Sequence, residues 1–163
     1  MSDESQTRVE LASESDCRSA ALALIKSARR TLVLFTRDLE PAIFGNVEFA
    51  TALQRFALRS RYSHIRIAVI DPTTAIREGH RLVALARRLP SFIEFRRPGP
   101  DHANLPDTFM VIDEAGIMYR PLSSRYEGFA DTSAPLEARK YLKQFAEIWS
   151  LAEPEQEFRR LGL

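Results

Sequence analysis

The segment from Phe109 to Arg120 constrains the fold of this chain more than any other part of the sequence. It contains two short apolar runs, joined by an acidic turn that includes Asp113, Glu114 and Gly116. Short apolar runs bounded by turn residues are typical of strands, and a brief glycine-containing turn between two of them indicates a β-hairpin. The sequence therefore predicts an antiparallel strand pair over residues 108–121, closed by Pro121.

Upstream of this hairpin, helical and strand patterns alternate. A helix should follow the capping residues at 13–16, a second helix should begin at Asn46, and a third should cover about 77–89. Strands are expected at 31–36, 65–70 and 91–96, and the nearly continuous apolar run at 31–36 predicts a strand covered on both faces. After the hairpin, residues 123–131 are irregular or a weak edge strand, and residues 134–150 form a long amphipathic helix.

This order predicts an α/β fold, with a mixed β-sheet flanked by helices on both faces. Alternation in the first part implies parallel strands, and the hairpin adds antiparallel ones. We expect residues 1–12 to be a flexible N-terminus and residues 13–163 to form a single domain.

The composition is that of an ordinary globular protein, with 45% apolar and 28% charged residues and a net charge of +1. No global field would draw such a chain to nucleic acid or membrane, so any basic site must be local. Because the sequence has no apolar signal region, no apolar run near membrane-spanning length and a single cysteine, Cys17, we expect a cytoplasmic protein without disulfides.

The element order, the strand that ends at Asp113, and a closing helix that ends with Phe145 and Trp149 together resemble one half of a phospholipase-D-like domain. The resemblance covers residues 15–150 and is closest to uncharacterised bacterial domains of that superfamily. In active members, two copies of a motif, His-x-Lys, four residues, then Asp, meet across a pseudo-dyad or a homodimer axis. One histidine attacks phosphorus, the other protonates the leaving oxygen, and the lysines stabilise the phosphoryl oxygens. For this chain the resemblance implies a homodimer.

The motif positions carry other residues in this sequence. When the motif aspartate is placed at Asp113, the lysine position falls on Thr108 and the histidine position on Pro106. Proline offers no nucleophile and threonine carries no charge, so the chemistry of the motif is lost. The chain is thus expected to be a pseudoenzyme with a degenerate motif and no catalytic residue, in which Asp113 bonds its own backbone in the turn.

Candidate ligand-binding residues follow the strands. Ligands of sheets with parallel strands favour the carboxyl ends of those strands, which here carry Arg37, Asp71 and Arg96. Arg120 and Arg125 follow the hairpin, where relatives place small polar residues beside the substrate phosphate. We predict that Arg37, Arg96 and Arg125 bind an anion, such as a phosphate-bearing ligand or an acidic protein partner. The same strand ends also fit a purely structural role as turns and caps.

A second basic surface is predicted on the helix at 77–89, opposite its leucine face, where His80, Arg87 and Arg88 are the candidates. The alternative interpretation of this pattern is a solvated helix surface. Two further functions remain open: a phosphodiesterase or nuclease with a rearranged site that uses His102 or His80, and a nucleic-acid-binding accessory domain. The three histidines show no metal-ligand spacing and no glycine-rich nucleotide loop is present, so neither a metal nor a cofactor is expected.

Overall fold

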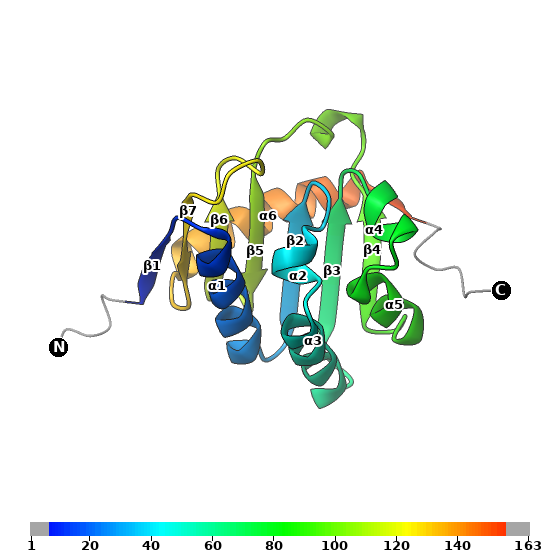
Figure 1. Ribbon diagram of the computed structural model, residues 1–163, viewed down its shortest axis with the longest axis horizontal. Coiled ribbons are helices and arrows are strands. Elements are labelled where there is room, and N and C mark those ends of the chain that lie inside the picture. Colours follow the sequence, from blue (N-terminus) through cyan, green and yellow to red (C-terminus); the bar gives the residue numbers. More distant parts are fainter. Residues whose placement is uncertain (1–6, 156–163) are drawn as a thin grey trace.

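The structure is a computed structural model that describes residues 7–155 (Figure 1). One eight-stranded sheet runs through the molecule in the order β1-β7-β6-β5-β2-β3-β4-β8. Helices cover both faces of this sheet, as Figure 1 shows. The predicted α/β fold with a mixed, helix-flanked sheet is therefore confirmed.

The first half of the chain builds the parallel part of the sheet. Its strands are β2 (Thr31–Thr36), β3 (His64–Val69) and β4 (Ile93–Arg97). They are connected and covered by α1 (Glu14–Ser27), α2 (Pro41–Phe44), α3 (Val47–Arg59), α4 (Thr73–Arg77) and α5 (Arg81–Arg88). The predicted caps are in place, since the side chains of Ser13 and Asn46 accept hydrogen bonds from Asp16 N–H and Phe49 N–H.

The second half of the chain adds antiparallel strands. These are the hairpin strands β5 (Thr108–Ile112) and β6 (Gly116–Arg120), followed by β7 (Gly128–Asp131) and the short β8 (Glu153–Pro154). Strand β5 pairs with β2, with Phe109 opposite Phe35 and Ile112 opposite Leu32. The predicted hairpin thus lies at the centre of the sheet and joins its parallel and antiparallel parts.

The sheet separates two cores. Helices α1 to α5 pack on one face, over inward side chains such as Leu34, Ile67 and Met110. On the other face α6 (Pro135–Ser150) is the one helix among residues 7–155, and it packs Phe145 and Trp149 against the alternate side chains of the strands. None of the helices among residues 7–155 has the length and apolarity needed to cross a membrane.

Two predicted elements differ from the structure. The helix predicted at 77–89 is broken, because Gly79 adopts a left-handed φ of +65° and His80 becomes the N-cap of α5. Arg77 and Arg88 therefore belong to different helices, α4 and α5. In the region 123–131 the first residues are irregular and Gly128–Asp131 forms β7, which lies between β1 and β6 and is therefore not an edge strand.

The expectation of a flexible segment over residues 1–12 is wrong for residues 8–11. These residues form β1 (Arg8–Leu11), which pairs antiparallel with β7. Only Leu11 is buried, and the Arg8 guanidinium lies 3.8 Å from the centre of the Phe129 ring. One buried residue in four is too weak a pattern to predict a strand. Residues 1–6 lie outside the described part of the chain.

Candidate functional site

The positions that the resemblance assigns to the catalytic residues lie where the parallel strands end. Because β5 runs antiparallel to β2, Thr108 lies beside the last residues of β2. We call this end of the sheet, where β2, β3 and β4 finish, the carboxyl edge. Pro106 is exposed there, whereas Thr108 is 1% exposed and its hydroxyl oxygen has no hydrogen-bond partner.

Arg120 occupies the space next to Thr108. The two residues are directly opposite each other in the β5–β6 ladder, and the Arg120 side chain is fully buried. Its guanidinium donates to the carboxylate of Glu40 at 2.5 Å and to the backbone carbonyls of Ser123 and Arg125 at 2.6–2.9 Å. A cation therefore lies beside the position that the resemblance assigns to the lysine, and its hydrogen bonds in the structure go to protein oxygens.

Glu40 is the partner that sequence reasoning missed. It lies between Leu39, whose φ is +60°, and Pro41 at the start of α2, so the chain turns sharply just after β2. That turn carries the carboxylate back over the sheet toward Arg120, 80 residues later in sequence. A separation of this length leaves no local signal, and only the strand order brings the two residues together.

Asp113 is held at the opposite end of the sheet from Thr108. Its carboxylate accepts hydrogen bonds from the backbone N–H groups of Arg29, Arg30 and Thr31 at 2.7, 2.7 and 3.0 Å. The expectation that Asp113 bonds the backbone of its own turn is therefore wrong. It ties the β5–β6 turn to the loop that precedes β2, which is a structural role.

The predicted anion-binding arginines do not share one surface. Side chains of β4 alternate between the faces of the sheet, which places Arg96 on the α6 side. There its guanidinium stacks on Trp149 at 4.4 Å, donates to the Trp149 carbonyl and pairs with Glu94. Arg96 is therefore engaged in packing α6, while Arg97, the next residue, is exposed at the carboxyl edge.

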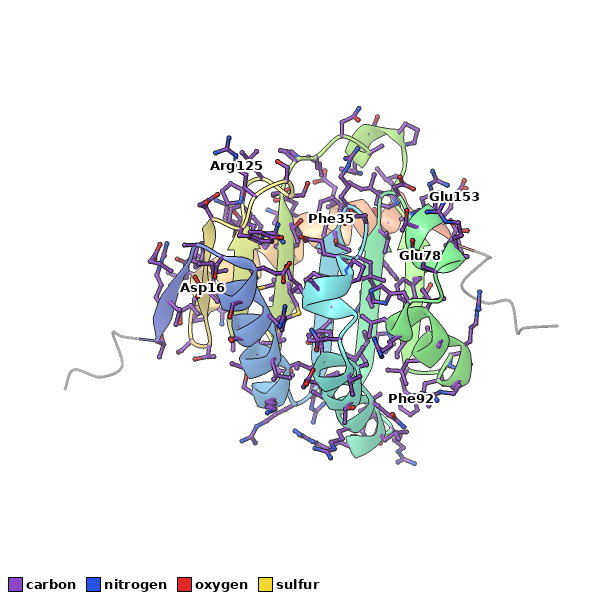
Figure 2. The ribbon with its side chains drawn as sticks, viewed as in Figure 1. Asp16, Phe35, Glu78, Phe92, Arg125 and Glu153 are labelled. Carbon is purple, nitrogen blue, oxygen red and sulfur yellow. The ribbon has the colours of Figure 1, made fainter. Side chains whose placement is uncertain are left out.

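Arg37 and Arg97 both lie near Asp71 at the carboxyl edge, since they follow or end the strands on either side of β3. The pKa of Asp71 is lowered by hydrogen bonds from Thr73 and further by the positive charges of Arg97 and Arg37. Arg125 is exposed in the β6–β7 loop at the same edge, next to the backbone carbonyl that binds Arg120. Figure 2 shows Arg125 at this upper edge, on the side of the hairpin.

His80 is not part of an exposed basic face. Its ring is 6% exposed; Nδ1 accepts from Leu82 N–H at 3.0 Å, and Nε2 donates to the Leu39 carbonyl at 2.8 Å. Burial lowers the pKa of His80, so the ring is neutral and both nitrogens are occupied. The ring forms one wall of a cavity of about 480 Å³ that Asp38, Glu78 and Arg81 also line. Arg87 is half-buried and Arg88 exposed at the far end of α5.

His102 and Asp107 lie in and after the loop that follows β4. His102 is half-buried in a short 3-10 turn and its Nδ1 has no partner. Asp107 is 7% exposed, its Oδ1 has no partner, and burial raises its pKa despite hydrogen bonding with Tyr119 and Gln144. Sequence analysis did not single out Asp107, because an aspartate between a proline and a threonine is typical of a turn.

Residues 7–155 contain neither a group of metal-binding side chains nor a thiol that is ionised at neutral pH. Over residues 7–155 no three His, Cys, Asp or Glu side chains are placed to hold a metal ion. Burial raises the pKa of Cys17 to about 11, so its thiol is protonated at neutral pH.

The fold is phospholipase-D-like. It is similar to Nuc from Salmonella typhimurium, a phospholipase D family member, with a TM-score of 0.63 and 15% identity over 91% of this chain and 98% of that one. NucT from Helicobacter pylori is similar with a TM-score of 0.58 and 12% identity, covering 91% and 97%. The archaeal chromatin protein TrmBL2 gives a TM-score of 0.64 and 11% identity, with 91% of this chain matching 54% of that one.

Within this fold class, the chain belongs to the family described as Domain of unknown function (DUF7931), whose model matches residues 13–161. No curated protein matches the sequence significantly. The resemblance to the phospholipase-D-like superfamily is confirmed at the level of the fold.

Proposed function

We propose that this protein is a non-catalytic phospholipase-D-like domain that binds a phosphate-bearing ligand at its carboxyl edge. The observation that carries the proposal is the ion pair between Arg120 and Glu40, buried against Thr108. Where the motif needs a nucleophile and a free cation, this chain has proline, threonine and a neutralised arginine. Neither attack on phosphorus nor stabilisation of developing charge is available from these groups.

Arg37 and Arg97 are the residues that we assign to the anion, with Arg125 approaching from the β6–β7 loop. The first two are exposed, and both are close enough to Asp71 to lower its pKa. Guanidinium groups bind phosphate oxygens in bidentate geometry, and ligands favour the carboxyl ends of parallel strands. Arg97 replaces Arg96 in this assignment because the alternation of β4 turns Arg96 toward Trp149.

We also propose that the domain is a homodimer. The chain matches 98% of the Nuc chain, and in the superfamily that it resembles, half-size members pair through the surface that carries the motif. Light scattering after size exclusion should give twice the chain mass of 18.6 kDa. A monomer at 50 µM would contradict the dimer without affecting anion binding.

The ligand proposal is tested by titrating inorganic phosphate and a phosphorylated peptide into the protein by calorimetry. The Arg37→Gln/Arg97→Gln variant should bind at least about tenfold more weakly, since each lost charge-assisted hydrogen bond costs about 1.5–3 kcal/mol. The Arg139→Gln/Lys143→Gln variant, on exposed positions of α6, is the matched control and should bind normally. Equal affinities in all three proteins, or no binding to the wild type, would contradict the proposal.

A phosphodiesterase with a rearranged site is the second candidate. It is favoured by one observation, the buried and unpartnered His102 Nδ1 and Asp107 Oδ1. Hydrolysis of bis-p-nitrophenyl phosphate distinguishes the two functions. We expect no turnover; activity that disappears in His102→Ala and persists in His80→Ala would establish the enzyme instead.

A further inference from the structure

Three helices end side by side at the edge of the sheet opposite the carboxyl edge. Helices α1, α3 and α5 all finish where β2, β3 and β4 begin, along the lower border of Figure 1. The carboxyl-terminal parts of these helices and the loops after them carry a row of basic side chains. We call this row the amino-edge cluster; its members are Lys26, Arg29, Arg30, Arg55, Arg59, Arg61 and Arg88. Figure 2 shows nitrogen-tipped side chains extending from this lower border.

Hydrogen bonds fix the loops that carry the cluster. Arg59 donates from Nη1 to the Ala28 carbonyl at 3.0 Å, which joins the ends of α3 and α1. The Arg30 carbonyl accepts from His64 N–H at 2.9 Å, which joins the two loops before β2 and β3. Asp113 holds the backbone of residues 29–31 through three further hydrogen bonds. The arginines therefore extend from a preorganised backbone.

The cluster has a large excess of positive charge. All seven of its side chains are exposed, and within the described residues none of them forms an ion pair with a carboxylate. The adjacent β5–β6 turn contributes Asp113 and Glu114, and Asp113 already accepts three backbone hydrogen bonds. Since the whole chain carries only +1, the rest of the protein is net negative. Positive charge is therefore concentrated at this edge of the sheet.

Helix dipoles explain part of this pattern. Cations in the last turn of a helix are favourable because the carbonyl end is partly negative, and this accounts for Lys26, Arg59 and Arg88. Arg29, Arg30 and Arg61 lie beyond the helix ends in the following loops and gain little from that field. These three arginines and Arg55, which lies before the last turn of α3, remain to be explained, because all four are exposed and none has a carboxylate partner among the described residues.

We propose that the amino-edge cluster binds the phosphate backbone of a nucleic acid. Packed helices lie about 8–10 Å apart, so three helix ends span roughly 20 Å. Over that length a duplex presents about a dozen phosphates, at one charge per about 1.7 Å. The number and spacing of the cations suit such a ligand, and contacts of this kind carry no sequence preference.

The surface chemistry favours nucleic acid over an acidic protein. Protein interfaces have an apolar centre inside a polar rim. Here the large apolar side chains that are exposed near the cluster are Leu58 and Tyr62. Tyr62 is 63% exposed, and the Arg61 guanidinium lies 5.0 Å from its ring and donates to its hydroxyl. An exposed aromatic beside arginine can stack on a base of a single strand.

Fluorescence anisotropy with a labelled 20-base-pair duplex and the matching single strand tests the proposal. The wild type should bind at 50 mM salt and lose affinity steeply toward 200 mM, because bound counterions are released. In Arg29→Gln/Arg30→Gln/Arg61→Gln, the slope of log K against log salt should decrease in magnitude by about 0.9 for each phosphate contact removed, and affinity at 50 mM should fall at least about tenfold. The corresponding triple lysine variant should keep the wild-type slope, which excludes misfolding as the cause.

The control removes three charges elsewhere. Arg139→Gln/Lys140→Gln/Lys143→Gln lies on α6 and should leave the slope unchanged. An equal loss in both glutamine triples would show a net-charge effect and overturn the proposal. So would full competition by polyglutamate of equal charge, which would indicate an acidic protein partner, or an absence of binding at 50 mM. The Arg37→Gln/Arg97→Gln variant should bind DNA normally, which keeps this site separate from the carboxyl edge.

Discussion

Arg120 lies opposite Thr108, the residue at the position that the resemblance assigns to the motif lysine, and protein groups hold its guanidinium. A fully buried guanidinium is tolerated because Glu40 neutralises its charge and backbone carbonyls accept its N–H groups. The same contacts close the β6–β7 loop over Thr108. The contacts of Arg120 therefore stabilise the surrounding fold.

Replacing Glu40 by Gln should destabilise the protein by about 2–4 kcal/mol, because a buried charge would be left without its counterion. Urea unfolding measures the change. Glu10→Gln removes an exposed ion pair with Arg8 and should cost less than about 1 kcal/mol. Similar losses in the two variants would contradict the role assigned to Glu40.

His80 should make stability depend on pH. Burial lowers its pKa in the folded protein below the ordinary value of 6.5, so below that pH the unfolded chain binds the additional proton. The His80 contribution is fully present above pH 6.5 and is lost progressively as pH falls below it. Urea unfolding of the wild type and His80→Asn between pH 8 and 5 should show a smaller decline in the variant; parallel curves would contradict this assignment.

At the scale of single residues, the sequence predicted where residues lie in the fold better than it predicted their interaction partners. Arg37 was placed correctly at the end of β2 because strand ends follow from the apolar pattern. The choice between Arg96 and Arg97 depends on which face each residue of β4 presents, and a register error of one residue reverses that choice. The burial of His80 depends on Gly79, whose positive φ breaks the predicted helix, so that α5 begins at Arg81 and not near residue 77.

At the scale of elements, Asp113 connects two parts of the sheet. Its carboxylate accepts from three backbone N–H groups before β2, while its own φ of +53° lies in the left-handed region. Both properties suit aspartate, which tolerates that conformation. A structural role therefore accounts for an aspartate at position 113.

Asp113→Ala should lower the free energy of unfolding by about 3 kcal/mol, because three donors lose their acceptor and alanine is strained at positive φ. Asp113→Gly removes the carboxylate without the strain, and Asp113→Asn keeps one acceptor oxygen. The expected order of stability is wild type, Asn, Gly, Ala. An alanine variant as stable as the wild type in urea would contradict the link between β5–β6 and β2.

Substitutions at Gly79 and Gly128 test two different costs, backbone strain at Gly79 and steric crowding at Gly128. A Cβ at Gly79 would meet nothing within 4 Å, so Gly79→Ala should cost only about 1 kcal/mol, from its positive φ. A Cβ at Gly128 would overlap the carbonyl oxygen of Tyr119 in the neighbouring strand β6. Gly128→Ala should therefore cost clearly more, with β7 displaced; equal melting temperatures of the two variants would contradict this difference.

At the scale of the whole molecule, the order of elements along the chain predicted the layers. Their order in the sheet needed more than periodicity, since the hairpin pairs with β2, the first strand of the parallel set, and not with β4, which precedes it. The sequence predicted that the hairpin adds antiparallel strands, but not the strand with which it pairs. The short pieces α2, α4, β1 and β8 were missed because each buries too few residues to leave a periodic signal.

The uneven distribution of charge should appear in the salt dependence of stability. Like charges in the amino-edge cluster repel one another, and added salt screens that repulsion. Between 20 and 500 mM salt the wild type should gain up to about 1 kcal/mol relative to Arg29→Gln/Arg30→Gln/Arg61→Gln. Thermal unfolding of both proteins measures this difference, and an equal salt response would show that the arginines do not repel.

The two outer strands of the sheet differ in length and composition. Strand β8 has two residues and includes Pro154, which lacks an amide proton, whereas β1 has four residues and each has an N–H group. Within the described chain, an extended peptide from another molecule can continue the backbone ladder beyond β1 but meets a proline beyond β8. A strand from another molecule can consequently extend the sheet at the β1 edge but not at the β8 edge.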